Sequence, residues 1–152
     1  MNENILVAYF SWSGKTKLAA EQIAKTAGCM LFEIDTAKKY PEQYQLCIEE
    51  AKAELAQNAR PKLKGALPDI SGVDKLALGF PLWGNTCPMA ILSFIESFDL
   101  LGKFVYPFCT HGGASTGKGA DDIRKSSRGG AVKPCMDANF LTAEKIRVWL
   151  DI

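Results

Sequence analysis

Long apolar runs are missing from this chain of 152 residues, and so is an excess of charge of either sign. No apolar run reaches the roughly 20 residues that a transmembrane helix needs, and the first four residues lack the basic start of a signal peptide. The formal net charge of +1 gives no electrostatic reason to bind nucleic acid or an anionic membrane surface. We therefore expect a cytoplasmic protein without nucleic-acid or membrane partners.

Metal ligands are scarce as well. The chain has a single histidine, His111, and an odd number of widely spaced cysteines with no Cys-x-x-Cys pair among them. This pattern argues against a zinc site and against a disulfide framework, so we expect reduced thiols and no metal. The five cysteines are Cys29, Cys47, Cys87, Cys109 and Cys135.

The chain is long enough, and at 47% apolar residues hydrophobic enough, to form one domain spanning residues 1–152. Expected strands alternate with expected helices throughout. The strands are predicted at 5–10, 29–34, 75–80, 103–109 and 131–136, and the helices at 15–27, 41–58, 88–98, 120–127 and after a cap at Thr142. Strict alternation predicts a three-layer, doubly wound α/β fold with a five-stranded parallel sheet.

In such a fold, ligands bind at the carboxyl ends of the strands, where the strand order reverses. The loops after the first, third and fourth expected strands have unusual chemistry, whereas the other connections are plain. Unusual loops after these three strands fit a sheet with the strand order 2-1-3-4-5, in which the direction of winding reverses between strands one and three.

The first of these loops joins an apolar strand to a helix and is rich in hydroxyls. Backbone N–H groups at such a helix start, together with the helix dipole, favour a phosphate. A nucleoside-triphosphate P-loop is excluded because Tyr9 stands where that motif needs glycine, and a Rossmann turn is excluded because the loop has one glycine rather than three. Two interpretations stay open: a loop that wraps a phosphate monoester, and an ordinary turn with Ser13 as the helix N-cap. The loop is Ser11, Trp12, Ser13, Gly14, Lys15 and Thr16.

The second loop places an aromatic residue, Trp83, next to Gly84. An indole at a strand end can stack on a planar heterocycle, and the glycine lets the adjacent peptide group rotate. The alternative is that Trp83 belongs to the core or to a subunit interface. The candidate residues are Pro81, Leu82, Trp83, Gly84, Asn85 and Thr86.

The third loop is too rich in glycine for a regular element. Its glycines suit a backbone that folds closely around a ligand edge and donates N–H groups to ring carbonyl oxygens. His111 either lies close to the ring of such a ligand or has no chemical role. The candidate residues are Thr110, His111, Gly112 and Gly113.

Taken together, these three loops resemble those of the flavodoxin family, in the same order along nearly the whole chain. The resemblance rests on the segments 11–16, 80–88 and 107–113. It implies non-covalently bound FMN, with the phosphate at Ser11, Ser13, Gly14, Lys15 and Thr16 and the ring between the second and third loops. Flavodoxins that carry electrons are strongly acidic, whereas this chain is nearly neutral.

The sequence therefore favours an FMN-dependent electron carrier, with an FMN-dependent NAD(P)H:quinone-type reductase as the alternative. Its partners would be redox proteins or a small planar acceptor, and it would be a monomer or a homodimer. No side chain is predicted to act as an acid–base catalyst. A flavin-free regulatory domain, such as a response-regulator receiver, is a remote alternative because the ends of strands one and three carry no clustered aspartates.

Overall fold

The computed structural model describes residues 2–113 and 115–152, and it confirms the predicted parallel sheet. The strand order is β2-β1-β3-β4-β5, with a sixth strand, β6, also paired with β4. The strands are β1 (Ile5–Tyr9), β2 (Met30–Glu33), β3 (Lys75–Pro81), β4 (Phe104–Thr110), β5 (Ala131–Val132) and β6 (Met136–Asp137). The helices are α1 (Lys15–Ala27), α2 (Tyr44–Ala56), α3 (Met89–Ile95), α4 (Gly119–Ser126) and α5 (Ala143–Leu150).

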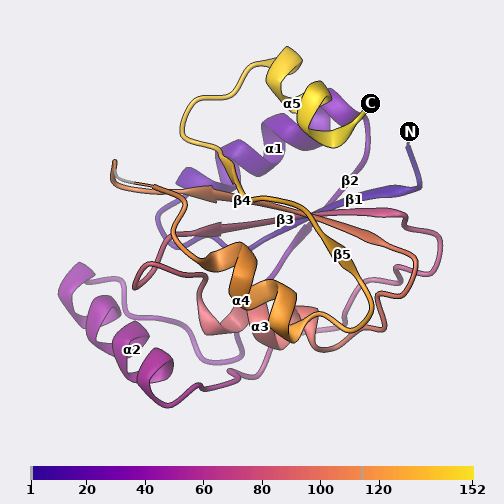
Figure 1. Ribbon diagram of the computed structural model, residues 1–152. Helices are drawn as coiled ribbons and strands as arrows, with labels where there is room; N and C mark the ends of the chain where they lie inside the picture. The colour runs from indigo at the N-terminus through magenta and orange to yellow at the C-terminus, as the bar shows by residue number, and fades with distance from the viewer. Residues whose placement is uncertain (1, 114) are drawn as a thin grey trace.

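Two apolar layers hold the sheet between its helices (Figure 1). On one face, α1 and α5 pack against the sheet with fully buried residues such as Ile23 and Ile146. On the other face, α3 and α4 do the same with Phe94 and Ile123. Central strands that are covered on both faces need apolar side chains at every position, which explains why all five residues of β1 are buried.

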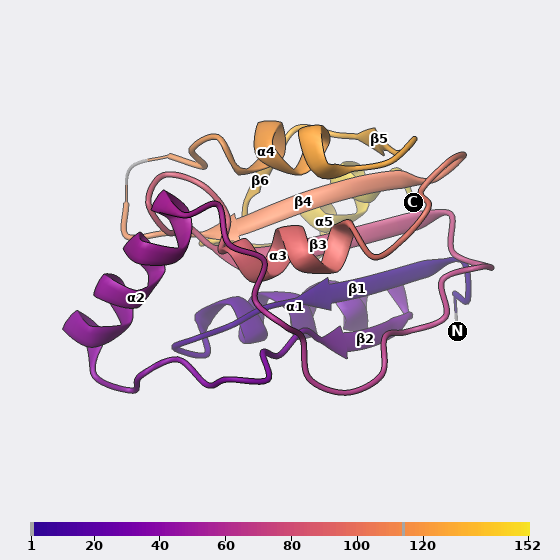
Figure 2. The same cartoon turned by 90° about the horizontal axis from the view of Figure 1, so that it is seen from below.

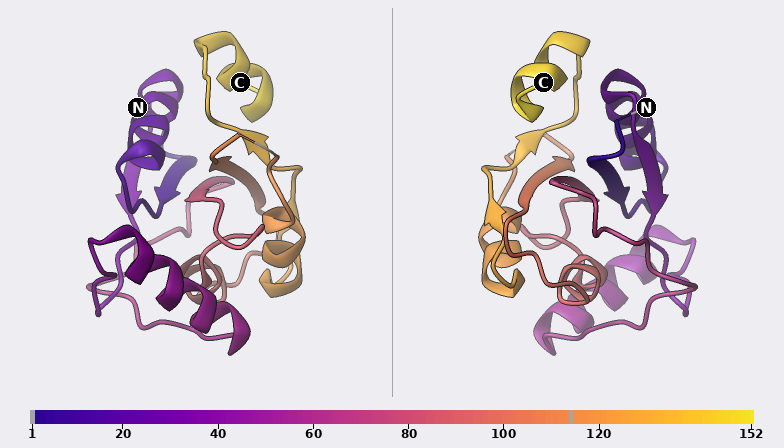
Figure 3. Two further views of the ribbon diagram at one scale, coloured as in Figure 1. Left: turned by 90° about the vertical axis from the view of Figure 1, so that its left-hand side faces the viewer. Right: turned by 90° about the vertical axis from the view of Figure 1, so that its right-hand side faces the viewer.

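Helix α2 differs from the other four because it lies beside the carboxyl ends of the strands (Figure 2). Seen from that side, α2 is the helix nearest the viewer (Figure 3, left). Of its residues only Cys47 is buried. The helix also begins later than the predicted position 41, because the side chain of Gln43 caps it by accepting the Leu46 N–H at 2.9 Å.

The predicted fifth strand, 131–136, is wrong as a single element. It is divided into β5 and β6, which pair with opposite ends of β4. The break contains Pro134, which has no N–H to donate to the sheet. The divided strand turns the chain after β6 toward the carboxyl edge of the sheet, where the predicted loops lie.

Two predicted helix boundaries are confirmed. Gly28 ends α1 with a φ of 64°, a conformation that glycine adopts without strain, and Thr142 caps α5 by accepting the Lys145 N–H at 3.1 Å. Over the described residues, no helix combines the length and the apolar content that crossing a membrane requires. All five cysteines are free thiols.

Candidate functional site

A cavity of about 470 Å³ opens at the carboxyl ends of the strands. Its volume lies in the range of small-molecule binding sites. The three predicted loops supply part of its wall, and α2 supplies the rest. The lining residues are Trp12, Ser13, Lys15, Tyr44, Cys47, Ile48, Ala51, Lys52, Leu55, Pro81, Leu82, Trp83, Gly84, Thr110, His111 and Gly112.

The first loop is organised by the Ser11 hydroxyl. Its oxygen accepts the N–H of Gly14 at 3.1 Å and the N–H of Lys17 at 3.2 Å, which folds the loop over the start of α1. The residue at the N-cap is Gly14 rather than Ser13, with a φ of 98° that is strained for any residue with a side chain. Ser11 and Gly14 therefore shape the loop from outside the cavity lining.

At the start of α1, several backbone N–H groups of this loop have no acceptor among the described residues. Within the described part of the chain, the N–H groups of Ser13, Lys15 and Thr16 form no hydrogen bond. The Thr16 hydroxyl is buried and bonded to that of Thr110 at 2.7 Å, and the Lys15 ammonium donates to the His111 carbonyl at 2.9 Å. Free N–H groups at a helix start beside a lysine form a site for an anion.

The second loop is a tight hairpin turn. The N–H of Trp83 donates to the carbonyl of Thr86 at 2.9 Å, and the Thr86 N–H donates back at 3.1 Å. The two residues between them, Gly84 and Asn85, have φ values of 59° and 65°, and a two-residue turn of type I′ requires positive φ at both. The turn fixes Trp83 and Gly84 in the cavity wall.

Trp83 is partly buried and packs edge to face against two other rings. The ring centroids of Phe10 and Tyr40 lie 5.5 Å and 5.2 Å from that of Trp83, with interplanar angles of 80° and 79°. These contacts hold the indole in place while part of it lines the cavity. Trp83 thus combines a core contact with a surface available to a ligand.

Two predicted residues of this loop turn away from the cavity. The Thr86 hydroxyl is buried and donates to a carboxylate oxygen of Asp122 in α4 at 2.5 Å. The carbonyl of Asn85 accepts the N–H of Lys118 at 2.8 Å. Both residues join the second loop to the start of α4.

The third loop is held by Asp137 of β6 and by Asn139 just after it, two residues that no sequence pattern had indicated. The Asn139 side chain accepts the His111 N–H and donates to the His111 carbonyl, both at 2.9 Å. The His111 ring bonds an oxygen of Asp137 at 2.8 Å, and its Nδ1 accepts the N–H of Gly113 at 2.9 Å. The Asn139 N–H, and then the His111 ring, lower the pKa of Asp137.

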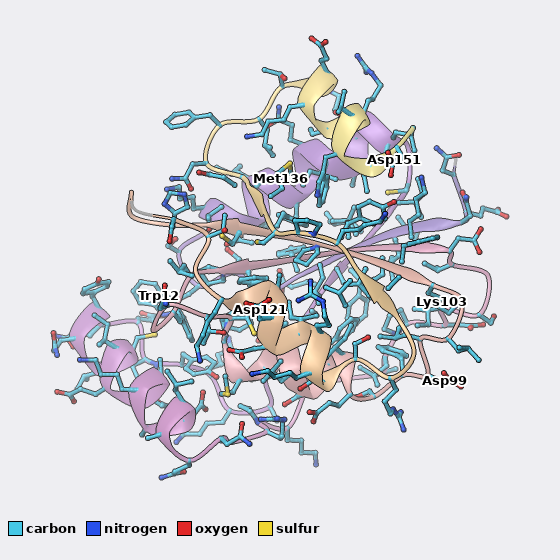
Figure 4. All side chains as sticks on the ribbon, in the orientation of Figure 1. Trp12, Asp99, Lys103, Asp121, Met136 and Asp151 are labelled. Atoms are coloured by element: carbon cyan, nitrogen blue, oxygen red, sulfur yellow. The ribbon has the colours of Figure 1, made fainter. Side chains whose placement is uncertain are left out.

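Helix α2 forms the remaining wall. The apolar residues of this helix, such as Ile48 and Leu55, line the cavity. Trp12, labelled in Figure 4 between the sheet and α2, donates its indole N–H to the carbonyl of Pro41 at 3.0 Å and lies 6.0 Å from the ring of Tyr44. The Tyr40 hydroxyl donates to Glu54 of α2 at 2.5 Å, and burial raises the pKa of Tyr40. Both contacts fix α2 over the strand ends.

The described residues hold no group of three or more His, Cys, Asp or Glu side chains placed to bind a metal ion. Ala114, in the third loop, lies outside the described residues.

A family model for flavodoxins matches residues 4–152. The chain belongs to the flavodoxin family. The resemblance inferred from the three loops is thereby confirmed. A search of curated protein sequences found no match.

Solved structures with the same flavodoxin fold cover almost the whole chain. A candidate flavoprotein of Bacteroides eggerthii is 33% identical, with a TM-score of 0.87, over 99% of this chain and 97% of that one. A candidate flavoprotein of Bacteroides uniformis is 28% identical, with a TM-score of 0.83, over 100% of both chains. A flavoprotein of Lactobacillus acidophilus, solved in complex with FMN, is 20% identical, with a TM-score of 0.79, over 97% of this chain and 98% of that one.

Proposed function

We propose that this flavodoxin-family protein binds FMN without a covalent link and transfers electrons through it. The observation that carries the proposal is that the N–H groups of Ser13, Lys15 and Thr16 have no acceptor among the described residues, beside a cavity with aromatic walls. The N–H groups fit a terminal phosphate, and the cavity fits a planar ring. The FMN complex of the Lactobacillus acidophilus relative supports the choice of cofactor.

In this proposal each part of the site has a separate task. Ser13, Lys15 and Thr16 hold the phosphate through their N–H groups, with the Lys15 ammonium nearby. Trp83 offers its indole to the ring, while Gly112 offers a backbone N–H to the ring's polar edge. The flavin supplies one- and two-electron redox chemistry, and the protein controls its environment and access.

The walls of the site are apolar where the ring would lie. Leu82 and Trp83 line one side, and Ile48 and Leu55 of α2 line another. An apolar wall disfavours added negative charge on a bound ring, because a low-dielectric environment solvates charge poorly. These residues would therefore make reduction to an anionic ring more difficult and exclude water from the ring.

One feature supports a second function on the same scaffold. The apolar side of α2 lines the cavity beyond the three loops, and an apolar surface of this kind suits contact with a small planar acceptor such as a quinone. In this second candidate, the protein is a reductase that oxidises a nicotinamide. For either function we propose a cytoplasmic location, with redox proteins as partners of the carrier.

A titration with two ligands tests the cofactor. Purified protein is titrated with FMN and, separately, with riboflavin, which has the same ring but no phosphate. We expect tight binding of FMN, with the shifted absorption of a protein-bound flavin, and much weaker binding of riboflavin. Equal affinities would contradict the phosphate site, and no binding of either ligand would contradict the proposed cofactor.

A redox titration then separates the two functions. Two well-resolved one-electron steps support the carrier. A single two-electron step, together with rapid oxidation of a nicotinamide in the presence of a quinone, supports the reductase. A flavin that accepts electrons from neither a redox protein nor a nicotinamide would contradict both.

A further inference from the structure

Several backbone polar groups of the third loop are held by hydrogen bonds on either side of Gly112. Both the N–H and the carbonyl of His111 bond the Asn139 side chain, and the carbonyl also accepts the Lys15 ammonium. The Gly113 N–H bonds the His111 ring, and the Thr110 carbonyl accepts the N–H of Leu82 from the second loop at 2.9 Å. Between these fixed points, the N–H of Gly112 has no acceptor within the described part of the chain.

Gly112 also lines the cavity. A backbone donor left free between hydrogen-bonded neighbours is ready to bond a ligand without rearrangement, because those neighbours already fix its direction. The structure therefore provides one prepared hydrogen-bond donor at this end of the site. Its acceptor would be a neutral carbonyl oxygen or ring nitrogen of a planar ligand.

The His111 ring can act in only one neutral form. Its Nδ1 accepts the Gly113 N–H, so the ring proton must be on Nε2, where it donates to Asp137 at 2.8 Å. The His111 side chain is only 6% exposed, which limits exchange of its partners with water. The surrounding charges come from three elements: Asp137 at β6, Lys15 of α1 at the His111 carbonyl, and Lys145 of α5 at the Asp137 carbonyl.

We propose that His111, with its tautomer fixed by Asp137 and its backbone fixed by Asn139, is a positioning residue that orients the Gly112 N–H toward the ligand. Asp137 of β6 and Asn139 after it thus support the site from behind, although neither residue lines the cavity. This inference rests on the proposed function only for the identity of the ligand, an FMN ring carbonyl.

Two substitutions of His111 separate its two hydrogen bonds. His111→Asn places an amide oxygen where Nδ1 accepts the Gly113 N–H, and His111→Gln reaches the position of Nε2 beside Asp137 but loses that acceptor. Amide hydrogen exchange, measured by NMR without flavin, reports the Gly113 N–H directly. We expect at least tenfold faster exchange at Gly113 in His111→Gln and near wild-type exchange in His111→Asn.

FMN affinity supplies the second measurement. We expect His111→Gln to weaken FMN binding about tenfold, which corresponds to about 1.4 kcal/mol, and His111→Asn to weaken it less. Equal exchange and equal affinity for both variants would overturn the inference. If the wild-type protein fails to bind FMN, the proposed function fails, while the exchange rates still decide whether His111 orders the loop.

If either His111 variant does not fold, Asp137→Ala provides the test. The Asp137 side chain is 48% exposed, so we expect this variant to fold. Nitrogen-15 shifts of the His111 ring should then change from one tautomer to a mixture, and exchange at Gly113 should accelerate. A ring that keeps a single Nε2–H tautomer in this variant, with unchanged exchange, would overturn the role of Asp137.

Discussion

Gly79→Ala should destabilise the centre of the sheet. Gly79 lies in β3 directly opposite Phe108 of β4. A β-carbon at position 79 would lie 2.2, 2.3 and 2.8 Å from three atoms of the Phe108 ring, whereas carbon atoms normally approach to about 3.5–4.0 Å. The ring has no free direction to move, because Phe108 is 0% exposed and its centroid lies 5.8 Å from the Trp149 ring.

The size of the effect follows from two opposing contributions. Replacing glycine with alanine restricts the unfolded chain and by itself stabilises a protein by about 0.4–1 kcal/mol. Overpacking a core costs about 1–3 kcal/mol, and an overlap of more than 1 Å against a fixed ring belongs at the upper end. We expect a net loss of about 2 kcal/mol in the free energy of unfolding, or a fall in Tm of about 4–8 °C.

Urea unfolding and calorimetry of the flavin-free protein measure this loss. Gly72→Ala is the matched control, because a β-carbon at Gly72 meets no atom within 4 Å and its φ is not positive. The double variant Gly79→Ala/Phe108→Leu should cost less than the sum of its single substitutions, because the smaller side chain makes room. A Gly79→Ala protein as stable as the Gly72→Ala control would refute the reasoning.

Three further predictions concern the site and the thiols. Trp83→Ala should weaken FMN binding or shift the flavin potential, and Trp83→Phe should recover part of the effect; if affinity and potential both stay unchanged, Trp83 has no role at the ring. Ser11→Ala should destabilise the flavin-free protein by about 1 kcal/mol, because the N–H groups of Gly14 and Lys17 lose their acceptor. Ser13→Ala should change stability by less than about 0.5 kcal/mol, and equal effects of the two substitutions would contradict the role of the Ser11 hydroxyl in shaping the loop. Burial raises the pKa of Cys87 from 9.0 to about 12, so its thiol should resist alkylation in the folded protein at pH 9 and react quickly in urea. Since the raised pKa favours the folded state below about pH 9, stability should decline as the pH rises toward 12, and Cys87→Ala should reduce that decline.

Apolar runs and turn residues in the sequence were sufficient to predict the parallel sheet. Continuous apolar runs such as β1 can be satisfied only between two layers of helices, and the turn residues around them limit the possible boundaries. The position of the first loop followed from the same patterns, because a hydroxyl-rich turn lies between the end of an apolar strand and the start of a helical period. Ser13 as N-cap was the weaker alternative, and the structure gives that position to Gly14.

The orientation of α2 could not be predicted from the sequence pattern. An apolar stripe on a helix indicates that one side avoids water, but it does not say whether that side faces a sheet or a cavity. Here the contacts of Trp12 with Pro41 and of Tyr40 with Glu54 hold the helix over the strand ends. These contacts join segments up to 29 residues apart, and no local pattern predicts them.

The sequence by itself determined the alternation of strands and helices and the three unusual loops, because both depend on short-range periodicity and turn chemistry. The strand order followed from the positions of those loops, because ligand loops gather where the order of a parallel sheet reverses. Only the tertiary structure decided which loop residues line the cavity, that α2 closes one side of it, and that Asp137 and Asn139 support His111 from 26 and 28 residues away. The break at Pro134 brings this last segment to the site. The physical reason is that hydrogen bonds between distant segments depend on how the layers pack, and packing is a property of the whole chain.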